Sequence, residues 1–136
     1  MKQGTFDITS LEKASKKLAE ILIRYEKDFS DDAIRDSVVQ RFEFTYSIAI
    51  KTIRKYLIER AFVVEDVNQM SFNEMVRTAN QLNLLKSNLE LWTEFREMRN
   101  LTPHTYDEVI AEKVVAVVPK FHEEIIFLIN NLKNNE

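Results

Sequence analysis

The segment RNLTPHTYDE, residues 99–108, concentrates side chains that can do chemistry, among them Arg99, Asn100, His104 and Tyr106. An arginine guanidinium can bind a phosphate through two hydrogen bonds. A neutral histidine can accept a proton from a hydroxyl group near pH 7. Arg99 and His104 together could therefore support metal-free attack of a ribose 2′-hydroxyl on its own phosphate. Asn100 could orient the histidine or bind the phosphate.

A purely structural role is compatible with the same residues. Arg99 could pair with a nearby acid while His104 only occupies a turn. An Arg and a His at this spacing form a short pattern that also arises by chance. The spacing alone leaves both interpretations open.

Helix-start signals surround these residues. Pro103 disfavours helical backbone at the residue before it, so we expect the preceding helix to stop near Asn100. Thr105 and Glu108 match a capping box, in which a Ser or Thr caps the helix and a Glu three residues later returns the bond. We therefore expect Thr105 to be the N-cap of the next helix and Tyr106 to be its first residue.

Other kinds of catalytic or metal site are not indicated. The chain has no cysteine, which excludes disulfides, thiolate zinc sites and thiol nucleophiles. It contains no glycine-rich phosphate loop and no HExxH pair. His122 falls within a helix, where we expect it to face solvent, and adjacent acids such as Glu123–Glu124 are interpreted as caps or solvated charges. We therefore expect no metal and no cofactor.

The composition favours one all-α domain over residues 1–136. Hydrophobic residues make up 45% and charged residues 30% of the chain, as in folded globular proteins. One glycine and two prolines are too few for a turn-rich β fold. The net charge of −3 gives no general attraction to polyanions. No signal peptide and no membrane-spanning run of about 20 apolar residues is visible, so we expect a cytoplasmic protein without membrane association.

Apolar residues recur at helical spacing in five stretches, joined by short polar breaks. This pattern predicts an up-and-down bundle of about five helices around a four-helix core. Ser71 and Ser87 each begin a capping-box sequence, SFNE and SNLE. Residues 61–70 are interpreted as a connector, and Pro119 should bend or break the last helix. The expected helices are about 7–28, about 32–60, one from 71, one from 87 to about 100, and one after 105–108.

The second stretch is apolar on more than one side. Phe44 and Ile48 lie outside its main apolar sector, so this helix either has neighbours on both sides or contributes to a subunit interface. Arg35 falls inside the apolar sector. It could extend to solvent from the helix start, or it could line a pocket.

Two separate motifs make the chain resemble a known family. RNLTPHTYDE is similar to the R-x4-H-x-Y signature of HEPN-domain proteins that are paired with minimal nucleotidyltransferases. Residues 34–57, IRDSVVQRFEFTYSIAIKTIRKYL, resemble the long second helix of the same family. The resemblance covers most of the chain, and the group is often labelled nucleotidyltransferase substrate-binding protein.

The resemblance implies a helical bundle that forms a homodimer, with RNA or a nucleotide as its ligand. Active members are metal-independent ribonucleases, so Arg99 and His104 become the catalytic pair and Asn100 a polar accessory. In toxin–antitoxin pairs of this kind, the partner nucleotidyltransferase silences the toxin by adding adenylate to the motif tyrosine, here Tyr106.

Two departures and two alternatives accompany this resemblance. The segment QLNLLKS lacks the glycine that many relatives carry, and Pro103 stands where a small polar residue is more usual. The first alternative is a non-catalytic, substrate-binding subunit of a two-component nucleotidyltransferase. The second is a structural dimer in which the motif is incidental.

Overall fold

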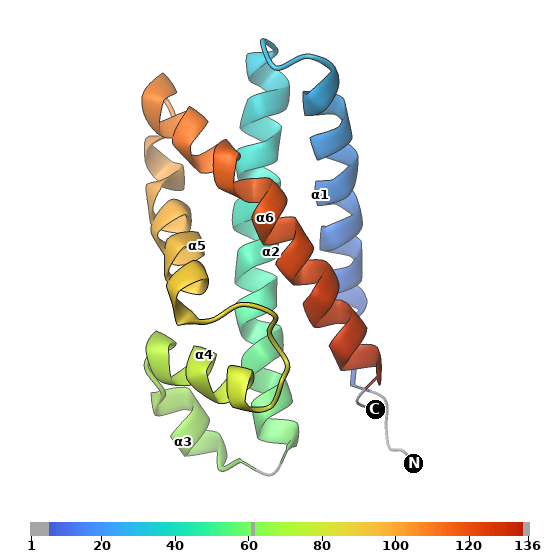
Figure 1. Ribbon diagram of the computed structural model, residues 1–136, viewed down its shortest axis with the longest axis vertical. Coiled ribbons are helices and arrows are strands. Elements are labelled where there is room, and N and C mark those ends of the chain that lie inside the picture. Colours follow the sequence, from blue (N-terminus) through green and yellow to red (C-terminus); the bar gives the residue numbers. More distant parts are fainter. Residues whose placement is uncertain (1–5, 61, 135–136) are drawn as a thin grey trace.

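The computed structural model describes residues 6–60 and 62–134, and their regular structure is entirely helical (Figure 1). The protein is an all-α helical bundle, as the sequence predicts. No helix within these residues is both long and apolar enough to cross a membrane. The elements are α1 (Thr9–Lys27), α2 (Asp32–Glu59), α3 (Val64–Gln69), α4 (Phe72–Gln81), α5 (Leu89–Leu101), the 3-10 helix η1 (Thr102–His104) and α6 (Glu108–Asn134).

Four helices build the core. α1 and α2 lie side by side and antiparallel, and α6 runs diagonally across both (Figure 1). α5 packs against α6 and α2, while α3 and α4 pack against the C-terminal part of α2. The expected four-helix core is thus formed by α1, α2, α5 and α6. The motif segment lies where α5 ends and α6 begins.

Aromatic rings hold α2, α5 and α6 together. Phe121 of α6 is fully buried, and its ring centroid lies 4.9 Å from that of Phe42 on α2 and 5.2 Å from that of Phe95 on α5. Both contacts are edge-to-face, the arrangement that aromatic quadrupoles favour. Tyr46 and Trp92 complete the cluster, at 6.3 Å and 6.4 Å from Phe121. This cluster fixes the relative position of the helices that carry the motif.

The capping signals are right at one position and wrong at another. Ser71 caps α4 in a complete capping box with Glu74. Ser87 does not cap α5, because Asn88 accepts the hydrogen bond from the backbone N–H of Glu90. The Ser87 hydroxyl and N–H instead donate to the carboxylate of Glu124, at 2.6 Å and 3.1 Å. Glu124 is only 3% exposed, so the prediction that it is a cap or a solvated charge is wrong.

The connector predicted at 61–70 is corrected, and of the two outcomes expected at Pro119 the break does not occur. The connector at 61–70 contains the helix α3, whose Val67 is buried; residue 61 itself lies outside the described residues. α6 continues through Pro119 without a break. Residues on both sides of the proline, including Val115 and Phe121, are buried in the core, and this packing offsets the loss of one backbone hydrogen bond.

The unusual residues of α2 have different environments. Phe44 is 63% exposed, whereas Ile48 is half-buried and packs against the core. Arg35 does not extend to solvent: it is 8% exposed, and its Nη1 lies 3.4 Å from Glu112 Oε2 and 3.6 Å from Asp32 Oδ1. Burial of an arginine is tolerated when carboxylates pair with it.

Replacing Phe121 by alanine should strongly destabilise the protein. We expect the free energy of unfolding to fall by about 3–5 kcal/mol, because a fully buried ring is lost and a cavity remains. Urea unfolding followed by far-UV circular dichroism measures the change. Val63, which is 54% exposed, provides the control, since Val63→Ala should change stability by less than about 0.5 kcal/mol. Equal stability of the two variants would contradict this account of the core.

Candidate functional site

The motif residues lie at the corner where α5 meets α6. Arg99 and Asn100 belong to the last turn of α5, His104 ends η1, and Tyr106 lies in the turn before α6. Arg99 is half-buried, whereas Asn100, His104 and Tyr106 are exposed. The four residues that the sequence singles out therefore lie in one short segment at this corner.

Local hydrogen bonds hold this corner, but not in the predicted way. Thr102 is helical (φ −56°, ψ −33°) rather than extended, and a 3-10 turn continues directly from α5 through Pro103. Pro occupies an early position of that turn, where its missing N–H costs little. The hydroxyl of Thr105 donates to the carbonyl of Thr102 at 2.9 Å and so stabilises the turn.

The N-cap of α6 is Asp107 and not Thr105. Asp107 Oδ1 accepts hydrogen bonds from the backbone N–H groups of Val109 and Ile110, at 2.9 Å and 3.3 Å. The helix consequently begins at Glu108, and Tyr106 is not its first residue. This later start leaves Tyr106 in the turn, with 85% of its surface exposed.

Arg99 lies near a buried tyrosine of α2. Burial raises the pKa of Tyr46 to about 12, while the positive charges of Arg96 and Arg99 oppose this rise. Tyr46 therefore keeps its proton at neutral pH, and its phenol is a neutral neighbour to both guanidinium groups. Arg96 is also held in place, because its guanidinium carbon lies 5.0 Å from the ring centroid of Phe72. Two cations thus lie near the same buried phenol.

Glu43 ties the corner to α2. The hydroxyl of Thr102 lies 2.9 Å from Glu43 Oε2 and 2.8 Å from the carbonyl oxygen of Arg99, so it can donate to either. Thr102 is buried and Glu43 half-buried, and a hydrogen bond to a carboxylate is stronger than one between neutral groups. Thr102 therefore links the C-terminal end of α5 to α2.

Arg99 has no acidic partner among residues 6–60 and 62–134. In this part of the chain, the ion pairs within 4.0 Å involve only Arg35 and Lys133 as cations. Its guanidinium therefore remains available for an anion.

Residues 6–60 and 62–134 contain no group of three His, Asp or Glu side chains that could hold a metal ion.

His104 and Tyr106 lie close together on the exposed side of the corner. Their ring centroids are 6.3 Å apart, and the ring planes make an angle of 71°.

His122 lies in another environment, within α6, and is half-buried. Burial lowers the pKa of His122, although a backbone hydrogen bond with Ser15 opposes this shift. The prediction that His122 faces solvent is therefore wrong.

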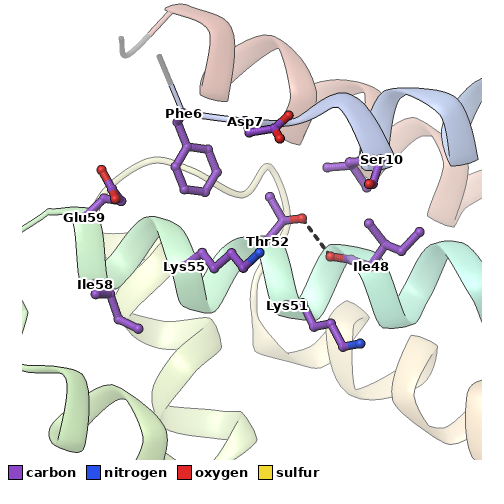
Figure 2. A pocket seen from close by; sticks show the side chains of 10 residues that line it. Phe6, Asp7, Ser10, Ile48, Lys51, Thr52, Lys55, Ile58 and Glu59 are labelled. Carbon is purple, nitrogen blue, oxygen red and sulfur yellow. Dashed lines mark hydrogen bonds between the residues drawn. The ribbon is translucent and has the colours of Figure 1, made fainter. Parts of the chain in front are cut away.

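The hollow in Figure 2 is a separate feature of the surface. It has a volume of about 880 Å³, lies between the start of α1 and the second half of α2, and contains none of the motif residues. Lys51 and Lys55 line it together with Asp7 and Glu59 (Figure 2). Two cations and two acids cancel, so this hollow has no charge preference for an anionic ligand.

Sequence reasoning missed Glu43, Tyr46 and Arg96 as parts of the site. Tyr46 falls in the main apolar sector of its helix, so it is expected in the core. Glu43 lies between the buried Phe42 and the exposed Phe44, and no helical pattern singles it out. The signal that could have found them is the second motif, because RFEFTY contains both Glu43 and Tyr46. Their role depends on contacts between α2 and α5 that no local pattern reveals.

Comparisons with known proteins agree with this architecture. Residues 6–134 match the family model described as nucleotidyltransferase substrate binding protein like. The chain is 31% identical over 102 residues to a Haemophilus influenzae protein named "Probable ribonuclease HepT", covering 75% of this chain and 69% of the relative. It also resembles a solved H. influenzae structure, described as revealing the fold of a substrate-binding domain of a nucleotidyltransferase. That similarity has a TM-score of 0.87 at 27% identity, and it covers 93% of this chain and 99% of the other.

The family match spans nearly all of the described chain, and the structural match spans the whole bundle. The similarity to the H. influenzae protein covers three quarters of the sequence and agrees with this family. The chain therefore belongs to the family of nucleotidyltransferase substrate-binding-like proteins.

Proposed function

We propose that this chain is a HEPN-type, metal-independent endoribonuclease, the toxin of a toxin–antitoxin pair whose antitoxin is a minimal nucleotidyltransferase. The observation that carries the proposal is the corner itself. Arg99 is half-buried without an acidic partner in the described chain, and His104 is exposed one short turn later. The similarity to a protein named as a probable ribonuclease supports the same reaction. We take residues 1–136 as one domain that acts in the cytoplasm.

The proposed reaction needs only these side chains and the RNA. His104 accepts the proton of a ribose 2′-hydroxyl, and the 2′-oxygen attacks the adjacent phosphorus. Arg99 binds the non-bridging oxygens, where negative charge grows in the transition state. The bond from phosphorus to the 5′-oxygen breaks, and a 2′,3′-cyclic phosphate remains. The leaving 5′-oxygen takes a proton from solvent water, and His104 returns its proton to solvent. Asn100 supplies a further polar contact to the phosphate or to the histidine.

A homodimer would complete the site. In one chain the motif residues lie on an open surface, and Asn100, His104 and Tyr106 are all exposed. Phe44 and Val109 are apolar side chains that are 63% and 78% exposed, and such residues favour contact with another protein. A second copy facing this corner would turn the open surface into a cleft, as the resemblance to HEPN proteins implies.

Tyr106 is well placed for modification by the partner nucleotidyltransferase. Its exposed hydroxyl can reach the active site of another enzyme, and its ring lies beside that of His104. Adenylylation at this position adds a bulky, negatively charged phosphodiester. Near Arg99, that charge would compete with the RNA phosphate and silence the nuclease.

A second candidate function is favoured by the family description. In this second function the chain presents either a bound substrate or itself to the nucleotidyltransferase, and it does not cleave RNA. Arg99 would then hold the phosphate of a nucleotide. Under this alternative, Arg99→Ala weakens nucleotide binding and no RNA cleavage exists to be lost.

His104→Ala should abolish ribonuclease activity. We expect the rate of RNA cleavage by the purified protein in EDTA to fall at least about 100-fold, because the general base is lost. His122→Gln, at the only other histidine, is the matched control and should cleave at the wild-type rate. Wild-type protein that neither cleaves RNA nor stops growth when expressed alone would sink the toxin proposal.

Co-expression with the minimal nucleotidyltransferase from the same genome should add adenylate to Tyr106. Intact mass spectrometry should show wild-type protein heavier by one or more adenylates, and peptide mapping should place them on Tyr106. Tyr106→Phe should remain unmodified and toxic in the presence of the partner. An adenylate on another residue, with Tyr106 untouched, would refute this mode of silencing.

A further inference from the structure

A second hollow, of about 600 Å³, lies between α1 and α6. None of the motif residues lines it. On each helix the lining residues are three or four positions apart, so each helix presents one continuous stripe. The α1–α6 groove is lined by Ala19, Leu22, Ile23, Tyr25, Glu26, Phe29, Glu112, Val115, Ala116, Pro119, His122 and Glu123.

The floor of the α1–α6 groove is apolar and open to solvent. Ile23 is 55% exposed and Phe29 65% exposed, although both are large hydrophobic residues. Phe29 is held by Tyr25, since their rings meet edge-to-face with centroids 5.1 Å apart. Exposed apolar side chains that line a groove mark an interaction site more strongly than isolated ones do.

The charged residues of the groove all have the same sign. Its lining includes Glu26, Glu112 and Glu123 and no Lys or Arg. Glu112 already pairs with Arg35 at 3.4 Å, so the negative charge that faces an occupant comes from the exposed Glu26 and Glu123. The hollow of Figure 2 differs, because its two lysines balance two acids. An occupant of the α1–α6 groove should therefore present basic side chains beside an apolar surface.

Pro119 removes one backbone donor from the part of α6 that lines the groove. Proline has no N–H, so the carbonyl of Val115, four residues earlier, lacks its usual donor within the helix. Val115 and Pro119 both line the groove.

We propose that the α1–α6 groove docks an amphipathic helix of the partner nucleotidyltransferase. The apolar ridge of that helix enters the groove over Ile23 and Phe29. Its flanking Lys and Arg residues meet Glu26 and Glu123. The stripe from Glu112 to Glu123 is about 16 Å long at about 1.5 Å per residue, which suits roughly three turns of a partner helix. The identity of the partner rests on the proposed function; the shape and charge of the groove do not.

Charge reversal tests the electrostatic part of the proposal. Isothermal titration of the full chain with the purified minimal nucleotidyltransferase gives the dissociation constant at low and moderate salt. Glu26→Lys with Glu123→Lys should raise it by at least about tenfold and flatten its salt dependence. Glu20→Lys with Glu97→Lys changes the net charge equally at exposed positions outside the groove, and it should have less than about a twofold effect.

A pair of apolar substitutions tests the floor. Ile23→Ser should weaken binding by about fivefold to tenfold, because the side chain loses its burial against the partner. Ile126→Ser is the matched control on α6, at a residue 43% exposed that does not line the groove. It should bind the partner as wild type does.

Three results with the variants would overturn the proposal, and so would one with the wild-type protein. One is an unchanged dissociation constant in both groove variants, and another is an equal loss in groove and control variants. The third is a change in the oligomeric state of the chain alone with unchanged partner binding, which would assign the groove to a second copy. RNA cleavage by the same variants separates this proposal from the proposed function, since groove variants should cleave normally. Absence of any complex with wild-type protein would reject the docking and the partner, but not the nuclease.

Discussion

The packing of Phe121 against Phe42 and Phe95 is the contact on which the rest of the structure depends. It joins α6 to both α2 and α5 in the centre of the bundle. Because these rings are fully buried, α5 and α6 cannot shift relative to each other without opening a cavity. The short connection between the two helices, which carries the motif, is therefore held at both ends by the core.

The site uses this rigidity. η1 continues from α5, Asp107 starts α6, and Thr102 bonds to Glu43 on the neighbouring helix. Reactive residues on a short segment supported by packed helices are held more precisely than residues on a free loop. The proposed chemistry requires this precision, since it relies on placing Arg99 and His104 around one phosphate.

Much of the fold was predictable because long helices repeat their apolar residues regularly. The four core helices and the Ser71 cap follow from spacing and local chemistry. The errors arise where a distant or competing group decides the local structure. Ser87 binds Glu124, which comes from another helix, and Asp107 replaces Thr105 because it lies closer to the first free N–H groups of α6. Glu43 escaped notice for the same reason, since its partner lies far along the chain.

The central claim is that Arg99 and His104 form a metal-free site for cleaving RNA. The chemistry of the RNA ends tests it most directly. Purified wild-type protein, treated with EDTA and given single-stranded RNA, should leave one fragment with a 2′,3′-cyclic phosphate and the other with a 5′-hydroxyl. Fragments with 3′-hydroxyl and 5′-phosphate ends, or intact RNA, would contradict the account.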